Sequence, residues 1–335
     1  MALSTLPLES DVQTIVDWLE YKILCSEFGT SSISELQRTY DVRRNAEDVD
    51  FENEASEENV FLQMLCGEIA RRIECLGPSY PFLLSESGES LEITGSMTDG
   101  AFIYLFCLFL SHFKKGEILD GTYLPDITND VRDLFQACST LAAAAIVSGH
   151  AYSFGFPRPD KTGFLEKLKI IYEKFGESKV VDGFPKGSAR STKDDQIDVI
   201  AWQDRPDKGA GKLYLLGQVA SGNNWPNKSI KGGPIDKFHG TWFIAPHIAS
   251  QPMAALFIPF CVVPEDNDTV LERTQVLGLE FGNIYYRHVL PCMAQSGIDL
   301  ARNQKSLIIE RISEVPKIIE WVVTQVNLVR KAASV

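Results

Sequence analysis

Residues 194–202, with the sequence DDQIDVIAW, and residues 213–220, with the sequence LYLLGQVA, decide the fold of this chain. Both segments are short and mostly apolar. The connector at 203–212, QDRPDKGAGK, has the Pro, Asp and Gly residues that are typical of turns. We therefore predict two β-strands joined as an antiparallel hairpin. Each predicted strand carries one polar residue among apolar neighbours, Asp198 in the first strand and Gln218 in the second.

A carboxylate and an amide on neighbouring strands are suited to bind a hard divalent cation. Mg²⁺ prefers oxygen ligands, keeps several waters and uses only one or two protein carboxylates. In the predicted hairpin the side chains of Asp198 and Gln218 converge, so they are candidate ligands of one Mg²⁺ or Mn²⁺ ion. Such a site favours metal-assisted hydrolysis of a phosphodiester. The alternative is a structural pair, in which each polar side chain only satisfies the other.

Outside the hairpin, the sequence predicts a helical part followed by an α/β part. Apolar residues at helical spacing occur in 10–40, 60–75, 98–113, 127–148 and 163–175. Residues 80–95 are Ser-, Glu- and Gly-rich and should be irregular, as should 149–161, so the first 130 or so residues are expected to be all-helical. Short strand-like segments follow at 179–182, 197–202, 212–219, 241–244 and 255–263.

The last predicted element is an amphipathic helical region at about 304–331, which Pro316 would kink or split. We therefore expect a helical domain at 1–130 and an α/β (α+β) domain at 131–335 that ends in this helix. The N-terminal domain is expected to bind a partner protein or to regulate activity. The C-terminal helical region is expected to serve either the core or a homo-oligomer interface.

Charge is unevenly distributed along the chain, whose net charge is −13. Residues 1–150 carry 25 acidic and nine basic side chains, whereas residues 151–335 carry 20 acidic and 23 basic side chains. A polyanion is repelled by the first set of charges and tolerated by the second. Any contact with nucleic acid is therefore expected in the C-terminal half.

The sequence predicts a cytoplasmic protein with no membrane association. The N-terminus, MALSTLPLESDVQ, lacks the basic and apolar regions of a secretory signal. The most apolar segment, at 101–110, is too short to span a bilayer. The seven cysteines are scattered and form no CxxC pair, which fits small buried side chains in a reducing compartment.

Residues 195–201, DQIDVIA, together with Gln218 on the following strand, resemble the PD-(D/E)XK nuclease superfamily and, within it, the Mrr-like restriction-endonuclease branch. That branch shows a D-G-G-I-D strand followed by a strand that ends in Q-x-K. The resemblance covers about residues 130–265. It implies a restriction-endonuclease-like core, with a central mixed β-sheet flanked by helices, in which Asp198 and Gln218 bind the metal.

The lysine of the family pattern, two residues after the glutamine, falls at Ala220 in this chain. Three explanations are open. The lysine has migrated to a neighbouring turn, with Lys228 as the candidate and Lys231 and Lys237 behind it. Alternatively, catalysis is lost and the domain only binds nucleic acid. The third explanation is an alanine engineered to inactivate the protein.

The resemblance also implies a further ligand from a preceding helix. Glu166 and Glu173 lie on one face of the predicted helix at 163–175, and Gln136 occupies a comparable place on the helix before it. We take Glu173 as the candidate. The implied catalytic residues are Asp198, Gln218 and Lys228, and the implied metal ligands are Asp198, Gln218 and Glu173. The basic residues chosen as phosphate-backbone contacts are Lys193, Lys231 and Lys237.

These observations predict a Mg²⁺- or Mn²⁺-dependent endonuclease that hydrolyses DNA phosphodiester bonds. By analogy with the family, its role would be prokaryotic restriction or anti-phage defence. Two alternatives remain. One is a catalytically inactive nuclease-like scaffold, or a nucleic-acid-binding subunit of a larger defence complex. The other is a nuclease directed at RNA.

Overall fold

The computed structural model describes residues 2–7, 9–36, 38, 54–113, 118–120, 127–265 and 268–333. The chain forms two compact units. Unit 1 comprises Met1–Ile127 and Lys317–Val335, and unit 2 comprises Thr128–Pro316. The division after Ile127 lies close to the predicted domain boundary after residue 130. The structure differs from the predicted second domain in that the C-terminal helix groups with the N-terminal part.

Unit 1 is mainly helical. The helices described in it include α1 (Val12–Cys25), α3 (Glu54–Leu76), α4 (Asp99–His112), the 3-10 turn η2 (Gly77–Ser79) and, from Lys317 onward, α10 (Val315–Ala333). Strands β2 (Thr30–Ser32), β4 (Ser90–Ile93) and β3 (Phe82–Leu84) form an antiparallel sheet in that order, and β1 (Ala2–Leu3) pairs with β5 (Leu119–Asp120). The N-terminal part is therefore not all-helical, because the segment expected to be irregular contains a hairpin.

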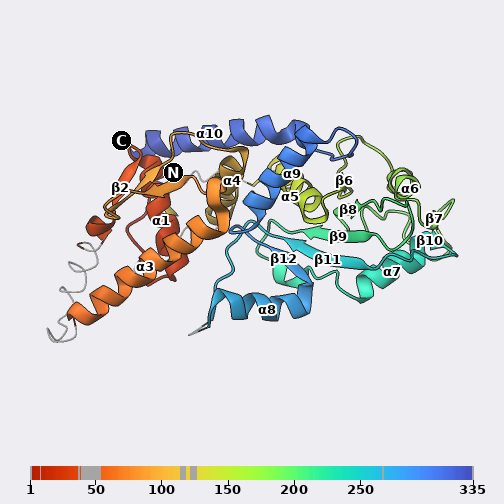
Figure 1. The fold of residues 1–335 in the computed structure, drawn as a ribbon, viewed down its shortest axis with the longest axis horizontal. Coiled ribbons are helices and arrows are strands. Elements are labelled where there is room, and N and C mark those ends of the chain that lie inside the picture. The colour runs from red at the N-terminus through yellow and green to blue at the C-terminus, as the bar shows by residue number, and fades with distance from the viewer. Residues whose placement is uncertain are drawn as a thin grey trace. The chain divides into compact units, whose positions relative to one another are not determined.

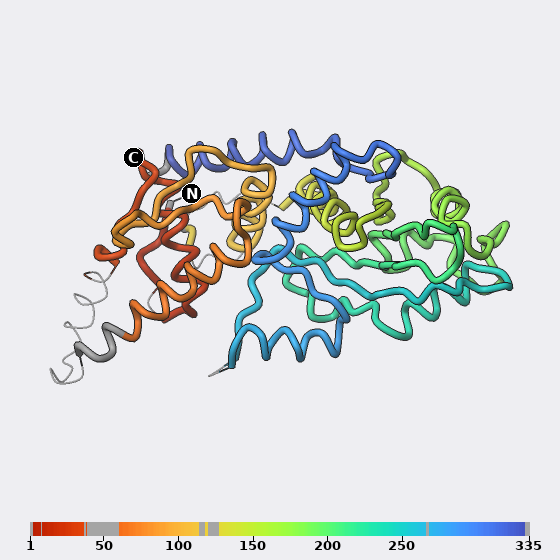
Figure 2. The backbone as a smooth tube through the Cα atoms, viewed as in Figure 1, coloured from red at the N-terminus to blue at the C-terminus, as the bar shows by residue number. Residues whose placement is uncertain are grey.

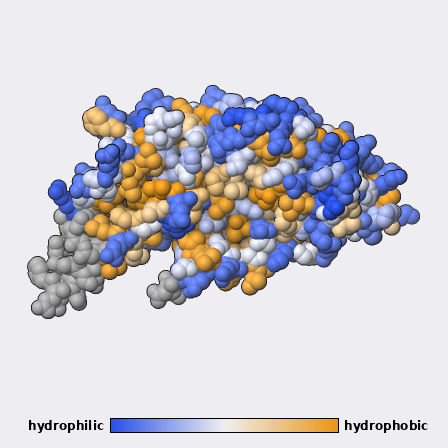
Figure 3. Space-filling model, in the orientation of Figure 1, coloured by the Kyte–Doolittle hydropathy of each residue, from blue (hydrophilic) through white to orange (hydrophobic). Residues whose placement is uncertain are grey.

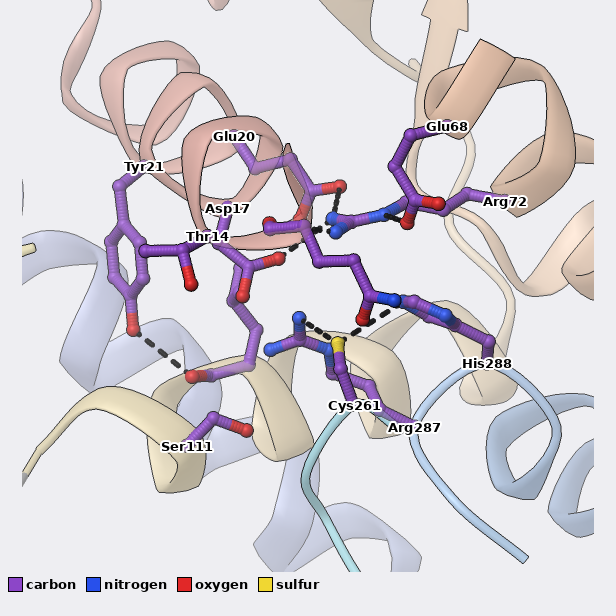
Figure 4. A network of polar contacts seen from close by, with 12 residues as sticks. Thr14, Asp17, Glu20, Tyr21, Glu68, Arg72, Ser111, Cys261, Arg287 and His288 are labelled. Atoms are coloured by element: carbon purple, nitrogen blue, oxygen red, sulfur yellow. Dashed lines mark hydrogen bonds and ion pairs between the residues drawn. The ribbon is translucent and has the colours of Figure 1, made fainter. Parts of the chain in front are cut away.

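The helices of unit 1 meet around a buried ion cluster as well as an apolar core. Arg72 on α3 is fully buried and contacts Asp17 and Glu20 of α1, each at 2.7 Å, as Figure 4 shows. It also pairs with Glu68, one turn earlier in its own helix, at 2.7 Å. A buried guanidinium is tolerated only where carboxylates compensate its charge. This cluster therefore sets how α1 and α3 pack against each other.

Unit 2 is built around a mixed β-sheet, which has five strands within the described residues (Figure 1). The strand order is β12-β11-β9-β8-β6. The bounds are β6 (His150–Ser153), β8 (Val199–Gln203), β9 (Leu213–Val219), β11 (Pro252–Phe257) and β12 (Asn283–Tyr285). Strands β6, β8 and β9 are antiparallel, and β9, β11 and β12 are parallel. The predicted mixed central sheet flanked by helices is confirmed, and so is the predicted hairpin.

Helices cover both faces of this sheet. They are α5 (Asn129–Val147), α6 (Phe164–Phe175), α7 (Gly233–Trp242), α8 (Val270–Phe281) and α9 (Leu290–Asn303), with the 3-10 turns η3 (Trp225–Asn227) and η4 (Ile312–Glu314). Helix α5 packs against β6, β8 and β9, and α9 packs against α5. Helices α7 and α8 lie on the opposite side of the sheet in Figure 1. A short ladder pairs β7 (Lys179–Val180) with β10 (Phe243–Ile244).

The core of unit 2 holds the hairpin rigidly. Ile200 and Leu216, which are paired across β8 and β9, are buried with Leu168 of α6 and Phe238 of α7. The tube in Figure 2 shows the sheet strands running side by side beneath α5 and α9. Because alternate residues of a strand point to opposite faces, this packing fixes the direction of the polar residues at the strand ends. Among the described residues, no helix has the length and apolar composition needed to cross a membrane.

Candidate metal and nucleic-acid site

The hairpin brings Asp198 and Gln218 into direct contact, as the sequence predicts. The backbone N–H of Asp198 donates to the carbonyl of Gly217 at 2.8 Å, which extends the ladder one residue beyond the start of β8. Gln218 then donates from Nε2 to Oδ2 of Asp198 at 2.6 Å. The backbone N–H of Val219 donates to the same oxygen at 2.8 Å. The end of β9 therefore holds the carboxylate in one orientation.

Asp198 lines a pocket of about 180 Å³ at the edge of the sheet. Helix α5 forms one wall of the pocket, the segment that follows β6 forms another, and the end of β9 closes it. The lining residues are Asn129, Arg132, Asp133, Gln136, Phe156, Pro157, Asp198, Val219 and Ser221. The pocket thus combines carboxylate, amide and guanidinium groups at the point where the chain enters β8.

Burial makes Asp198 an unusual carboxyl group. Its residue is only 9% exposed, and this loss of hydration raises its pKa to about 7. The hydrogen bonds from Val219 and Gln218 and the charge of Lys228 oppose the rise, whereas the charge of Asp194 adds to it. The net result is a carboxylate whose charge is only partly compensated by the protein. A cation in the pocket would supply the missing compensation.

Gly155 allows the backbone to pass close to two oxygens of this site. A Cβ at position 155 would lie 2.5 Å from Oδ1 of Asp198 and 2.6 Å from Oε1 of Gln136. Gln136 is buried and donates from Nε2 to Ser153 Oγ at 2.8 Å. This bond orients the amide of Gln136. Oxygens of Gln136 and Asp198 therefore lie on the same side of the pocket, beside Gly155.

These residues fit a hydrated divalent cation better than a fully protein-bound one. Among the described residues, no three His, Cys, Asp or Glu side chains are grouped so as to hold a metal. Asp198 and Gln136 offer one carboxylate and one amide oxygen, and Mg²⁺ commonly completes such a set with water and phosphate oxygens. Gln218 presents its amide N–H to Asp198. That geometry favours a role in orienting Asp198 over the predicted role as a ligand.

Glu173, the third predicted ligand, is not brought to this pocket. It is exposed on α6, whose opposite face buries Leu168 and Ile171 in the core. Glu173 lines a separate, open hollow of about 390 Å³ near β7. On the face drawn in Figure 3, the end of unit 2 that carries α6, β7 and β10 is mostly hydrophilic. The other candidate of that helix, Glu166, accepts from the N–H of Gly163 at 3.2 Å and caps its own helix.

The structure also locates the residues that bear on the missing lysine. Ala220 is buried in an apolar cluster with Leu256 and Phe281. Lys228, directly after η3, is half-buried, and its positive charge lowers the pKa of Asp198. Lys228 thus acts electrostatically on the carboxylate, although it does not line the pocket. Its predicted catalytic role remains a prediction.

The three lysines predicted to contact nucleic acid have different surroundings. Lys193 is exposed, and its Nζ lies 4.9 Å from the ring centroid of Phe156, which lines the pocket. Lys231 donates to the carbonyl of Leu279, near the C-terminal end of α8, at 2.9 Å. Lys237 pairs with Asp195 at 3.3 Å. Of the three, Lys193 is the lysine beside the pocket.

Helix α5 contributes pocket-lining residues that sequence reasoning missed. Asn129, Arg132, Asp133 and Gln136 follow the spacing i, i+3, i+4, i+7, so they share one face of the helix, and all four line the pocket. Of these four residues, the sequence pattern singles out only Gln136. Asp133 forms two contacts with the guanidinium of Arg311, at 2.5 and 3.0 Å. The helical spacing of these polar residues is the sequence signal that predicts a shared polar face on α5.

Comparison with known proteins assigns no family to the chain. No protein-family model, no curated protein and no solved structure matches it. The support for Asp198 is therefore its place in the pocket, and that for Gln218 is its hydrogen bond to Asp198, together with the sequence pattern and not any relative.

Proposed function

We propose that this chain is a metal-dependent endonuclease that hydrolyses DNA phosphodiester bonds at the Asp198 pocket. The observation that carries the proposal is the buried Asp198 carboxylate, whose pKa is raised to about 7 in a pocket that also holds an amide oxygen of Gln136. A carboxylate is costly to bury without a compensating cation. A phosphodiester bound with Mg²⁺ or Mn²⁺ accounts for that placement.

Each residue of the pocket has a distinct part in this proposal. Asp198 and Gln136 would hold the ion, which supplies a Lewis acid and lowers the pKa of bound water. Gln218 keeps the carboxylate oriented through its bond to Oδ2. Arg132, in the first turn of α5, adds positive charge where the helix dipole already favours a phosphate. Lys193, beside the mouth, would contact the DNA backbone.

Plasmid cleavage tests the proposal. The wild-type protein is expected to cut supercoiled DNA with Mg²⁺ or Mn²⁺ and not with EDTA. Asp198→Asn, which keeps the size of the side chain, should reduce the rate by about a hundredfold or more because it removes the carboxylate ligand. Glu173→Gln is the matched control, because it neutralises an exposed carboxylate outside the pocket. Cleavage by Asp198→Asn at the wild-type rate would overturn the proposal.

Lys228→Ala addresses the missing lysine separately. If Lys228 supplies the charge that the family places at position 220, the variant should cleave at least about tenfold more slowly, with DNA binding little changed. Lys179→Ala is the control, because Lys179 is exposed and lines the separate hollow near β7. Full activity of Lys228→Ala would show that the lysine has not migrated there.

A second candidate function is a non-catalytic module that binds nucleic acid. It is favoured by the burial of Ala220 in an apolar cluster and by the neutralisation of Asp133 by Arg311. This module would bind DNA in a salt-dependent manner. It would not cleave DNA, whichever metal ion is added. Parallel assays with single-stranded RNA distinguish the third possibility, an RNA-directed nuclease.

The proposal extends to the biology of the chain. We propose that it acts in the cytoplasm, in prokaryotic restriction or anti-phage defence, and that unit 1 binds a partner protein or a second copy of the chain. The acidic N-terminal half repels a polyanion and so leaves DNA contact to unit 2. Phage challenge of cells that express the wild type or Asp198→Asn checks the role. Protection by both proteins alike would favour the scaffold over the nuclease.

A further inference from the structure

A cysteine is held beside two basic side chains at the sheet edge of unit 2. Cys261 lies beyond the end of β11, and Arg287 and His288 lie beyond the end of the neighbouring parallel strand β12. The carboxyl ends of parallel strands emerge at the same edge of a sheet. The backbone N–H of Arg287 donates to the carbonyl of Phe260 at 3.1 Å, which ties the two segments together. The local backbone therefore places these side chains next to one another.

Both basic side chains contact the sulfur. Nη2 of Arg287 donates to Sγ of Cys261 at 2.6 Å, and Nε2 of His288 lies 3.3 Å from the same atom, as Figure 4 shows. Arg287 and His288 are fully buried, whereas Cys261 is half-buried. A guanidinium is always charged in proteins. A fixed cation at this distance favours the thiolate over the thiol, and the thiolate is the reactive form.

Other cysteines of the chain have different surroundings and serve as references. Burial raises the pKa of Cys25 to about 11 and that of Cys138 to about 12, so both remain thiols at neutral pH. Cys66 and Cys75 are exposed on α3 and are at least as accessible to a reagent as Cys261. A difference in reactivity between Cys261 and these exposed cysteines therefore reports chemistry and not access.

We propose that Cys261 is a reactive thiolate that hydroperoxides oxidise to a sulfenic acid. The thiolate sulfur attacks one oxygen of hydrogen peroxide, and the S–O bond forms as the O–O bond breaks. Thiolate and hydrogen peroxide thus give a sulfenic acid and hydroxide, which carries away the negative charge. Sulfur loses two electrons and the peroxide gains them. Arg287 and His288 are positioning residues that stabilise the thiolate. The proposal concerns a site separate from the Asp198 pocket and does not depend on nuclease activity.

Competitive alkylation of the wild-type protein gives the first test. Limiting iodoacetamide is applied from about pH 5 to about pH 9, and the labelled peptides are quantified by mass spectrometry. The half-maximal rate at Cys261 is expected below about pH 7.5, the upper end of the range for cysteines beside basic groups. Cys66 and Cys75, labelled in the same samples, give the reference profiles, and the Cys261 profile is expected at lower pH than theirs. Identical profiles for Cys261 and Cys66 would overturn the proposal.

A variant and a peroxide assay test the assignment further. His288→Gln removes the imidazole while keeping a polar side chain, and it should move the Cys261 profile toward higher pH. Because the wild-type profile is decisive by itself, the test does not depend on the folding of this variant. Low concentrations of hydrogen peroxide with dimedone should label Cys261 before Cys66, and dithiothreitol added before dimedone should prevent labelling. Labelling of Cys66 before Cys261 would contradict the proposal. The variant Cys261→Ser is the control that identifies the peptide labelled at Cys261.

Discussion

At the scale of single residues, the candidate site depends on Asp198 and on the atoms that surround it. Its carboxylate accepts two hydrogen bonds on Oδ2, from Gln218 and Val219, and its other oxygen lies beside Gly155. The bonds hold the group in place but do not cancel the cost of burying its charge. Substitutions can therefore test two properties separately: how the charge of Asp198 is compensated, and how much space surrounds its Oδ1.

The first prediction concerns the pH dependence of stability. Burial raises the pKa of Asp198 to about 7 in the folded protein, against about 3.9 in an unfolded chain. Between these values the folded state holds a proton that the unfolded state has released, so the free energy of unfolding falls as pH rises through this window. The full effect is on the order of 4 kcal/mol.

Urea unfolding of the wild type and of Asp198→Asn at about pH 4.5 and about pH 7.5 measures this contribution. In Asp198→Asn the free energy of unfolding is expected to fall much less between these two pH values, because Asn cannot ionise. In Glu173→Gln it should fall as in the wild type. Mg²⁺ at the higher pH should stabilise the wild type and not Asp198→Asn, because an ion that binds only the folded state stabilises it. Equal pH slopes for the wild type and Asp198→Asn would refute the pKa assignment.

The second prediction concerns Gly155→Ala. The added Cβ would lie 2.5 Å from Asp198 Oδ1 and 2.6 Å from Gln136 Oε1, so these side chains or the backbone must move. We expect a loss of about 1–3 kcal/mol in the free energy of unfolding, and loss of plasmid cleavage. Gly183→Ala is the control, since a Cβ there meets nothing within 4 Å. Wild-type cleavage by Gly155→Ala would show that these two oxygens are not used together.

At the scale of elements, α5 and the helix that covers it determine the shape of the pocket. Four polar residues of the pocket share one face of α5, and the opposite side of the helix packs in the core. Helix α9 approaches α5 so closely that a Cβ at Gly297 would lie 1.9 Å from the carbonyl oxygen of Leu141. A glycine at this crossing lets the two helix backbones approach each other.

The third prediction compares two helical glycines. Gly297→Ala should destabilise the protein by about 1–3 kcal/mol, because α5 and α9 must separate. Gly278→Ala in α8 should stabilise it by up to about 1 kcal/mol, since alanine favours the helix and nothing lies within 4 Å of the new Cβ. Urea midpoints of both variants give the comparison. Two changes of the same sign would contradict the assigned helix packing.

Sequence periodicity predicted some elements and missed others for identifiable reasons. Helix α6 begins and ends within one residue of its predicted range, because its apolar stripe is complete within the segment. Strand β6 was missed because it lies in an aromatic, Gly- and Pro-containing segment expected to be irregular, and α5 and β8 supply its burial. Helices α8 and α9 were also missed. Their interior Gly278 and Gly297 weaken the local helical signal.

At the scale of the whole molecule, the chain divides into units that sequence order alone does not predict. The C-terminal helix begins at Val315 with Pro316 in its first turn, where a missing N–H breaks no helical hydrogen bond. Pro316 therefore lies in the first turn of this helix. The prediction that it kinks or splits a helical region at 304–331 is wrong. From Lys317 onward the helix belongs to unit 1, with Val322 and Val329 fully buried.

The fourth prediction tests this assignment. The ring of Trp321 lies 4.9 Å from that of Phe106 and 5.8 Å from that of Phe113, both in the α4 region. Trp321→Ala should reduce stability by about 3 kcal/mol and speed amide hydrogen exchange in α4. Val323→Ala is the control, because Val323 is largely solvent-exposed. Unchanged exchange in α4 would contradict the grouping of α10 with unit 1.

The sequence by itself determined the hairpin, the direction of its polar residues and the convergence of Asp198 with Gln218. These features follow from strand alternation and turn composition, which act over a few residues. Only the tertiary structure decided that Gln218 donates to Asp198, that Gln136 and Gly155 share the pocket, and that Glu173 lies elsewhere. Local periodicity specifies which face of an element is apolar. Which faces then meet depends on packing between segments far apart in the chain, and that packing is not encoded within any one of them.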